Sequence, residues 1–278
     1  MVNGAQRYGD LNGEHSNNLR TTRRRSAGGL STGITAIVLA GERPGGDPLA
    51  TAFGVAAKAL IPVGGVPMVD RVVAALENCA EIERVIVVGG DALAAVRNNV
   101  APARSTIAET VGEIVGQGRF PLLVTTADHA LLNAEMIAAF VAGARGNDLA
   151  VAVVERKTLL AAYPYNKRTW LPFRGGAYSG ANLFWIGSAR VRPVLDVWAA
   201  VEQKRKRGRA LLSAFGPAVL IGTALRLLTI QGALARVGRR FGLKAAAVVL
   251  PQAEACIDVD TVADHTLVET IMAARAVA

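Results

Sequence analysis

One lysine and three aspartates stand at positions suited to phosphate and metal chemistry. Lys58 closes a glycine-rich loop that follows an apolar run, and small residues with a basic side chain suit close approach to an anion. Asp128 ends the segment Leu-Leu-Val-Thr-Thr-Ala-Asp. Asp258 and Asp260 alternate, so in an extended chain both carboxylates face one side and could meet one ion. Because carboxylates hold Mg²⁺ beside phosphates, this set predicts metal-assisted phosphate chemistry.

Each of these residues also has a purely structural explanation. Glycine-rich loops after strands are common, and neither G-x-G-x-x-G nor G-x-x-x-x-G-K-[ST] occurs here. Aspartate is frequent at strand ends, and Asp260 could simply cap a final helix, with Asp264 in its first turn. Only the combination of lysine and aspartates, in this order at predicted strand ends, favours the chemical interpretation.

The same residues carry a resemblance to a known family. The segments LAG and KALIPVGGVPMVDRVVAAL, with a glycine- and arginine-bearing loop between them, resemble the opening of the MobA-like NTP transferases. The triplet Thr-Ala-Asp ending at Asp128 and the segment DVDTVAD from Asp258 resemble that family's two acidic motifs. The chain departs from the family pattern at three places. The G-x-[GST]-x-R-[ML]-G core is missing, Ala130 replaces a proline, and Val262-Ala263 replaces Pro-Glu.

The resemblance implies a nucleotidyltransferase that moves an NMP group from an NTP, with CTP or GTP favoured, to a phosphorylated acceptor and releases pyrophosphate. It assigns catalysis to Lys58, Asp128 and Asp260, and a Mg²⁺ ion to Asp128 and Asp260. The nucleotide contacts that we expect are Ala40, Gly41, Arg43, Lys58, Gly89 and Thr110. Gly180 and Asn182 are expected to contact the acceptor, and a tight turn entering a strand is the alternative for both.

The periodicity of the chain predicts the elements that would position these residues. Apolar runs with strand character alternate with helical patterns. The expected strands are 34–39, 84–88, 122–126, 149–154, 182–186 and 245–250, and the expected helices include 91–98, 106–115, 133–144, 192–206, 231–240 and 261–274. Such alternation favours a mostly parallel sheet covered on both faces, with ligands at the carboxyl ends of its strands. With the resemblance, this predicts a three-layer α/β/α sandwich of the GT-A or Rossmann-like type, with a mixed, mostly parallel sheet.

Charge and composition predict three regions. Residues 1–33 are polar, include three consecutive arginines and read as a disordered basic tail. Residues 34–278 form the nucleotidyltransferase domain, into which about 161–240 is expected to insert as a basic helical lobe. That range holds 14 Lys or Arg and 2 Asp or Glu, a net charge of +12, and an apolar stretch at 210–225 that is too short for a membrane span. Peripheral contact with an anionic membrane surface is predicted, and a basic face over a buried hairpin is the alternative.

The composition disfavours several other classes. Two distant cysteines and three histidines give no disulfide framework and no zinc motif. No nucleic-acid motif accompanies the positive charge. We therefore expect an NTP, Mg²⁺ and a phosphorylated small-molecule or lipid acceptor as partners, and a cytoplasmic protein with peripheral contact at the inner membrane face. Two alternatives stay open: a GT-A glycosyltransferase that uses Asp258-Val-Asp260 on a nucleotide-sugar, and a non-catalytic, membrane-peripheral binding protein of the same fold.

Overall fold

One eight-stranded sheet runs through the computed structural model, which describes residues 33–41, 45–104, 106–203, 222 and 225–277. Its main path is β10-β7-β9-β6-β1-β4-β5, with β8 paired to β9. The strands are β1 (Ile34–Ala40), β4 (Ile82–Gly89), β5 (Val100–Pro102), β6 (Leu122–Thr126), β7 (Leu149–Glu155), β8 (Leu171–Phe173), β9 (Gly176–Ile186) and β10 (Ala245–Val249). The antiparallel pairs in this sheet are those of β9 with β6, β7 and β8, and the other pairs are parallel. The predicted mixed, mostly parallel sheet is therefore confirmed.

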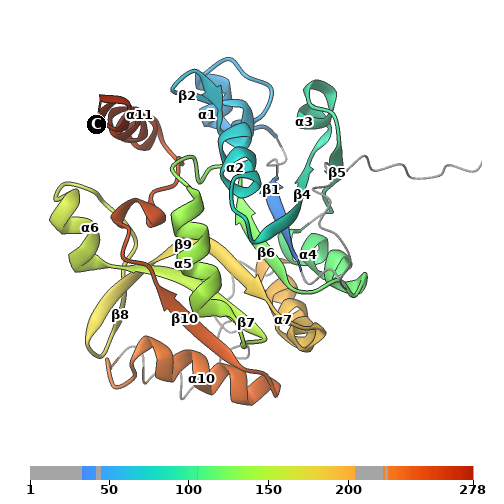
Figure 1. Ribbon diagram of the computed structural model, residues 1–278, viewed down its shortest axis with the longest axis vertical. Helices are drawn as coiled ribbons and strands as arrows, with labels where there is room; N and C mark the ends of the chain where they lie inside the picture. The colour runs from blue at the N-terminus through green and yellow to red at the C-terminus, as the bar shows by residue number, and fades with distance from the viewer. Residues whose placement is uncertain (1–32, 42–44, 105, 204–221, 223–224, 278) are drawn as a thin grey trace, which may run out of the picture.

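Helices cover both faces of this sheet (Figure 1). They are α1 (Pro48–Ala52), α2 (Met68–Glu77), α3 (Asp91–Val96), α4 (Ile107–Gly116), α5 (Ala134–Ala144), α6 (Arg156–Ala162), α7 (Arg192–Gln203), α10 (Ile230–Phe241) and α11 (Val262–Val277). Buried side chains of α2 and α5, such as Leu76 and Phe140, form the core on one face. Val111 of α4 and Leu195 of α7 pack on the other. The predicted three-layer sandwich is therefore confirmed.

Local sequence signals explain where several elements begin. Asn133 precedes α5 and accepts a hydrogen bond from the Met136 N–H at 2.9 Å, as expected for a helix N-cap. Thr106 caps α4 in the same way through the Glu109 N–H. Strand β6 has the predicted bounds, and its first four residues are buried, as a central strand covered on both faces requires.

The range 161–240 requires a correction. The sequence predicted an inserted basic helical lobe, but β9 of this range lies between β7 and β6 and pairs with both. Helix α7 of the same range packs on α4, and α10 packs on β10. The described part of the range is thus integral to the sandwich, because its longest strand fills the centre of the sheet. The basic cluster 204–207 and most of the apolar stretch 210–225 lie outside the described residues, as does the tail 1–32.

Shorter pieces complete the fold around the loop after β1. The 3₁₀ turn η1 (Lys58–Leu60) leads into a small hairpin of β2 (Pro62–Val63) and β3 (Val66–Pro67). A second 3₁₀ turn, η3 (Ala253–Cys256), follows β10 and leads to the start of α11. Among the described residues, no helix combines the length and apolar character that crossing a membrane requires.

Candidate active site

The ammonium of Lys58 lies between two carboxylates from distant parts of the chain. Its Nζ is 2.7 Å from Asp128 Oδ2 and 2.6 Å from Asp260 Oδ1. Thr126 Oγ1 donates to the other oxygen of Asp128 at 2.6 Å, which fixes the orientation of that carboxylate. The structure therefore brings together the three side chains for which the resemblance implies a catalytic role.

Backbone hydrogen bonds hold the two aspartates at the carboxyl end of the sheet. The Ala127 N–H donates to the Leu39 carbonyl at 2.9 Å, which keeps the end of β6 beside the end of β1. The Val259 N–H donates to the Asp128 carbonyl at 3.1 Å, so the segment with Asp260 lies across the same edge. Parallel strands present their carboxyl ends together, which is why this edge is the usual ligand site of such sheets.

Helix α11 joins the segment with Lys58 to the segment with Asp260. The helix starts two residues after Asp260, and its Glu269 accepts a hydrogen bond from the Gly64 N–H at 2.8 Å. His265 Nε2 lies 2.7 Å from the Pro62 carbonyl, and its ring packs 4.5 Å from the ring of Phe53. The β2–β3 hairpin that follows Lys58 is thereby tied to the helix that follows Asp260.

The charges of the cluster suit a divalent cation accompanied by phosphates. Burial alone would lower the pKa of Lys58, but the charges and hydrogen bonds of Asp128 and Asp260 raise it above its ordinary value, so the side chain is cationic at neutral pH. One lysine and two carboxylates leave a net charge of −1. Within the described residues no group of three or more His, Cys, Asp or Glu side chains forms a metal cage. Two carboxylates nevertheless fit Mg²⁺, which commonly binds one or two carboxylates together with substrate phosphates.

Asp258 differs from the expectation that it would face the same ion as Asp260. Its carboxylate pairs with the guanidinium of Arg168 and accepts a hydrogen bond from Asn182 Nδ2 at 3.0 Å. Burial tends to raise the pKa of Asp258, but Arg168 and Asn182 together hold it below its usual value. The Asp258 carboxylate is therefore paired with the guanidinium of Arg168 and not with Lys58. Arg168 could not be predicted from the sequence, because the loop between α6 and β8 carries no recognisable motif.

The predicted nucleotide contacts fall into two groups. Ala40 and Gly89 are paired neighbours at the ends of β1 and β4, and Gly41 follows directly. Among the described residues, a methyl group on Gly41 would meet no atom within 4 Å, whereas one on Gly89 would lie 2.8 Å from the Leu93 side chain and 3.2 Å from the Ala40 carbonyl. Gly89 thus allows close packing of the strands.

Thr110 is buried in α4, where its hydroxyl donates to the Thr106 carbonyl and accepts from the Arg104 N–H, both at 2.9 Å. Arg43 lies outside the described residues.

The predicted acceptor contacts lie on β9. Gly180 pairs with Val153 of β7 within a continuous strand, so the structure has no tight turn at that point. Asn182 has a left-handed φ of 48°, which is uncommon for a residue other than glycine. The Asn182 amide points to Asp258, which places Asn182 next to the segment of Asp260.

His129 is a further buried group that sequence analysis did not identify. It is 1% exposed, and neither ring nitrogen has a hydrogen-bond partner of normal geometry among the described residues. Burial lowers its pKa to about 4, against the opposing charges of Asp128 and Asp258. The ring is therefore neutral at physiological pH. The one feature of the sequence that could have drawn attention to His129 is its position directly after Asp128.

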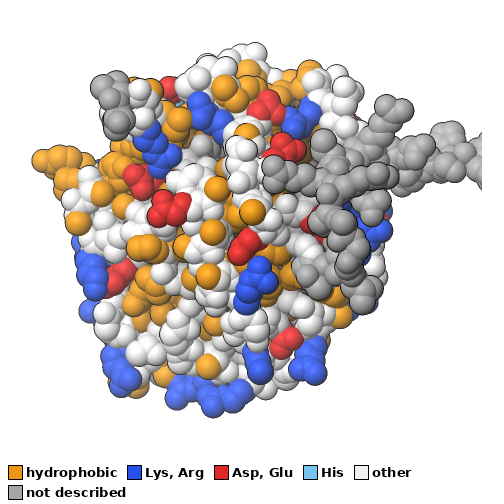
Figure 2. Space-filling view, viewed as in Figure 1, with side chains coloured by type: hydrophobic (Ala, Val, Ile, Leu, Met, Phe, Trp, Pro, Cys, Tyr) orange, Lys and Arg blue, Asp and Glu red, His pale blue; other side chains and the backbone are white. Residues whose placement is uncertain are grey.

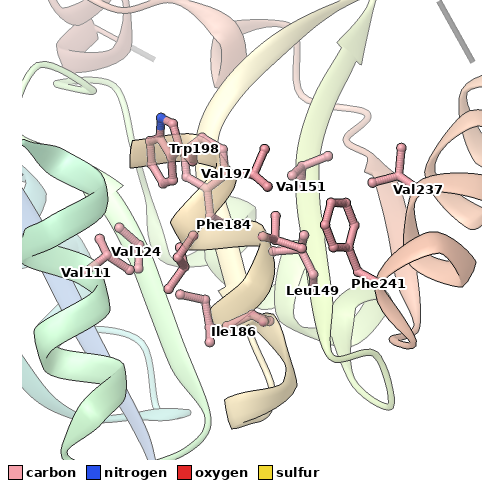
Figure 3. A pocket seen from close by; sticks show the side chains of 13 residues that line it. Val111, Val124, Leu149, Val151, Phe184, Ile186, Val197, Trp198, Val237 and Phe241 are labelled. Carbon is pink, nitrogen blue, oxygen red and sulfur yellow. The ribbon is translucent and has the colours of Figure 1, made fainter. Parts of the chain in front are cut away.

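A separate cavity of about 250 Å³ lies on the face of the sheet that carries α4 and α7 (Figure 3). Apolar side chains line it, among them Phe184 of β9, Trp198 of α7 and Phe241 of α10. None of the residues discussed above as catalytic or metal-binding borders it. Because the lining offers no charged group, this cavity is not suited to a triphosphate or a metal ion.

Comparison with protein families and known structures points to one class of enzyme. Residues 36–218 match the model of the MobA-like NTP transferase domain. A structure described as a hypothetical transferase from Thermus thermophilus is 31% identical in sequence, with a TM-score of 0.73 over 84% of this chain and 99% of that chain. The comparison with curated proteins gave no match.

Two more distant structures share the fold. One is 4-diphosphocytidyl-2C-methyl-D-erythritol synthase from Anaerococcus prevotii, with 12% identity and a TM-score of 0.53 over 87% of this chain and 96% of that chain. The other is CMP:2-keto-3-deoxy-manno-octonic acid synthetase in complex with CTP, with 16% identity and a TM-score of 0.52 over 87% of this chain and 98% of that chain. At these identities the likeness concerns the fold alone.

Proposed function

We propose, from the premise that this chain belongs to the MobA-like NTP transferase family and is an enzyme of the nucleotidyltransferase class, that it transfers an NMP group from an NTP to a phosphorylated acceptor. The observation that carries the proposal is the contact of Lys58 with both Asp128 and Asp260 at the carboxyl edge of the sheet. A triphosphate requires a cationic side chain, and its metal ion requires carboxylate ligands. The contact of Lys58 with both aspartates brings these groups together.

In the proposed reaction an oxygen of the acceptor's phosphate attacks the α-phosphorus of the NTP. A new P–O–P bond forms, the bond between the α-phosphorus and the bridging oxygen breaks, and that oxygen leaves with pyrophosphate. Lys58 moves from the carboxylates to the phosphates, where its charge stabilises the negative charge that develops during transfer. Gly41 has no side chain, which favours close approach of backbone N–H groups to the triphosphate.

Asp128 and Asp260 are the proposed ligands of Mg²⁺. When bound, the ion would neutralise phosphate charge and favour departure of pyrophosphate. The release of both carboxylates from Lys58 makes them available as ligands. Thr126 keeps the Asp128 carboxylate oriented while Lys58 moves, because it bonds the oxygen that Lys58 does not use.

CTP is the favoured nucleotide and GTP the second choice. The two distant structures are named for cytidylyl or CMP products, and one contains CTP. The described residues offer no base-reading motif of their own, since the Thr110 hydroxyl is already bonded within the backbone around α4.

The proposed acceptor is a phosphorylated small molecule or lipid. The enzyme itself is proposed to be cytoplasmic and able to contact the inner face of the membrane. Figure 2 shows Lys and Arg side chains along the lower edge of the molecule, where Figure 1 places α10. Arg236, Arg239 and Arg240 are exposed on this helix. Basic residues near an anionic bilayer contribute about 1 kcal/mol each, which supports reversible attachment.

Pyrophosphate release from each of the four NTPs, with a panel of phosphorylated acceptors and with Mg²⁺ or a chelator, tests the proposal. We expect release with CTP or GTP that depends on both the acceptor and the metal. A GT-A glycosyltransferase would instead release a nucleoside phosphate from a nucleotide-sugar. A binding protein would give neither product. Asp258 and Asp260 have separate partners, Arg168 and Lys58. This supports the nucleotidyltransferase over the glycosyltransferase, in which both carboxylates would bind the same metal ion.

A further inference from the structure

A second charged cluster lies directly beside the Lys58 cluster. Arg168, from the loop between α6 and β8, pairs with the Asp258 carboxylate and also approaches the Asp258 carbonyl, with Nη2 at 3.3 Å. Asn182 of β9 donates to the second carboxylate oxygen of Asp258. Asp258 is two residues from Asp260, so the two clusters share one short segment of backbone.

The backbone of β9 is distorted at the point where it meets this cluster. Leu183 is the last residue that pairs with β6, and the pairing with β7 is irregular between Val151 and Val153. Asn182 lies at this break with its left-handed φ. A non-glycine residue held in that region is a strained feature, and such features concentrate where a side chain must be aimed at a ligand.

Two buried polar atoms in the loop of Arg168 have no hydrogen-bond partner in the described part of the chain. Arg168 Nε and Asn166 Oδ1, from the same loop, are buried and have no hydrogen-bond partner among the described residues. A guanidinium carries five N–H donors, and Asp258 occupies only part of this set. Buried polar groups without partners call for an explanation such as a bound molecule or water.

We infer that Arg168, held by Asp258 and flanked by Asn182, binds the anionic group of the acceptor beside the Lys58 cluster. This inference rests on the proposed function and deepens it. The planar guanidinium fork matches a phosphate or carboxylate group, and its pairing with Asp258 keeps the fork in place when no acceptor is present. Asn182 supplies a neutral amide, which can help to orient the bound group. Arg168 therefore selects an acceptor that carries a negatively charged group, while Lys58 binds the phosphates of the NTP.

Tungstate, a heavy tetrahedral dianion that stands in for phosphate, provides a direct test with the full chain. We expect anomalous density at Arg168 in crystals soaked with tungstate, in addition to any ion at Lys58. In calorimetric titrations with CTP and Mg²⁺ present, Arg168→Gln should weaken tungstate binding about tenfold or more, because a charge-assisted hydrogen bond is lost. Lys167→Gln, which changes an exposed neighbour in the same loop, should change the affinity less than about twofold.

Two further variants separate recognition from folding. Arg168→Lys keeps the charge but loses the fork, and an intermediate affinity is expected. The double variant Arg168→Gln/Asp258→Asn removes both charges of the pair, so no unpaired carboxylate is left, and it should melt near the wild-type temperature yet still lose tungstate.

Ions found only at Lys58, or tungstate retained by the double variant, would overturn the inference. Pyrophosphate release that fails for every NTP, with tungstate still bound at Arg168, would reject the proposed function and leave the subsite standing.

Discussion

Lys58 Nζ and Asp260 Oδ1 lie 2.6 Å apart although 202 positions separate them in the chain. The contact exists because the loop after β1 and the segment before α11 meet at one edge of the sheet. Asp128, at the end of β6, lies between them in sequence and contacts the same ammonium. Three segments thus converge on one point, and this convergence can be tested residue by residue.

Asp128→Asn and Asp260→Asn should each reduce turnover about a thousandfold or more, because each removes a carboxylate that would hold the metal. The melting temperature should change little, since the Asp260 side chain is 55% exposed and the Asp128 side chain 21% exposed. Steady-state pyrophosphate release and thermal melting provide the two measurements. Asp196→Asn, at an exposed position of α7, is the matched control. Near-normal activity in both site variants would reject their role as metal ligands.

Lys58→Gln should strengthen the binding of Mn²⁺ in the absence of nucleotide, because the ammonium no longer competes for Asp128 and Asp260. The same variant should raise the KM for the NTP and lower kcat, since it also loses a contact to the phosphates. Paramagnetic titration with Mn²⁺ measures the first effect and initial rates the second. If Mn²⁺ bound more weakly to the variant, the ammonium would not be a competitor of the metal.

The pH dependence of the Lys58 contribution follows from its raised pKa. A cation stabilised in the folded state contributes stability that is fully present below its unfolded pKa of 10.5 and is lost only as the pH rises through the higher folded value. We therefore expect the difference in melting temperature between wild type and Lys58→Gln to stay constant from pH 6 to pH 9. A difference that disappears within that range would contradict the pairing.

Gly41→Ala and Gly89→Ala should have opposite consequences. A methyl group at Gly89 meets Leu93 and the Ala40 carbonyl, so we expect a loss of about 2 kcal/mol in the free energy of unfolding. A methyl group at Gly41 would meet no atom of the part of the chain that the structure describes, so stability should change little while nucleotide affinity falls. Denaturant unfolding and a fluorescent-nucleotide titration distinguish the two. Unchanged nucleotide binding in Gly41→Ala would exclude a close approach of phosphate there.

His129 should make the protein sensitive to mild acid. Its ring binds a proton near pH 6.5 when unfolded but only at about pH 4 when folded, so the unfolded state binds more protons between these values. Stability should therefore fall as the pH drops from 6.5 to 4, by about 3 kcal/mol in total. His129→Leu should remove this part of the acid slope in urea unfolding curves. An equally steep slope in the variant would show that other groups cause it.

Sequence patterns and the family resemblance were sufficient to predict most of the layered fold and to single out Lys58, Asp128 and Asp260. Periods of two and of 3.6 residues are local properties, so strands such as β6 and caps such as Asn133 could be predicted from short windows. The carboxyl ends of neighbouring parallel strands share an edge, and this rule predicts that Asp128 lies next to the loop of Lys58. The family match over residues 36–218 confirmed the class of enzyme.

Which side chains face each other at that edge depends on contacts between distant segments, and these contacts are visible only in the folded protein. Strand β9 enters between β7 and β6, which a local pattern does not encode because strand order depends on pairings between distant segments. Asp258 and Asp260 occupy equivalent positions of one motif, yet Arg168 approaches one and Lys58 the other. The partner of a buried carboxylate depends on which cation the folded loops bring near it, and that proximity arises only when the whole sheet has assembled.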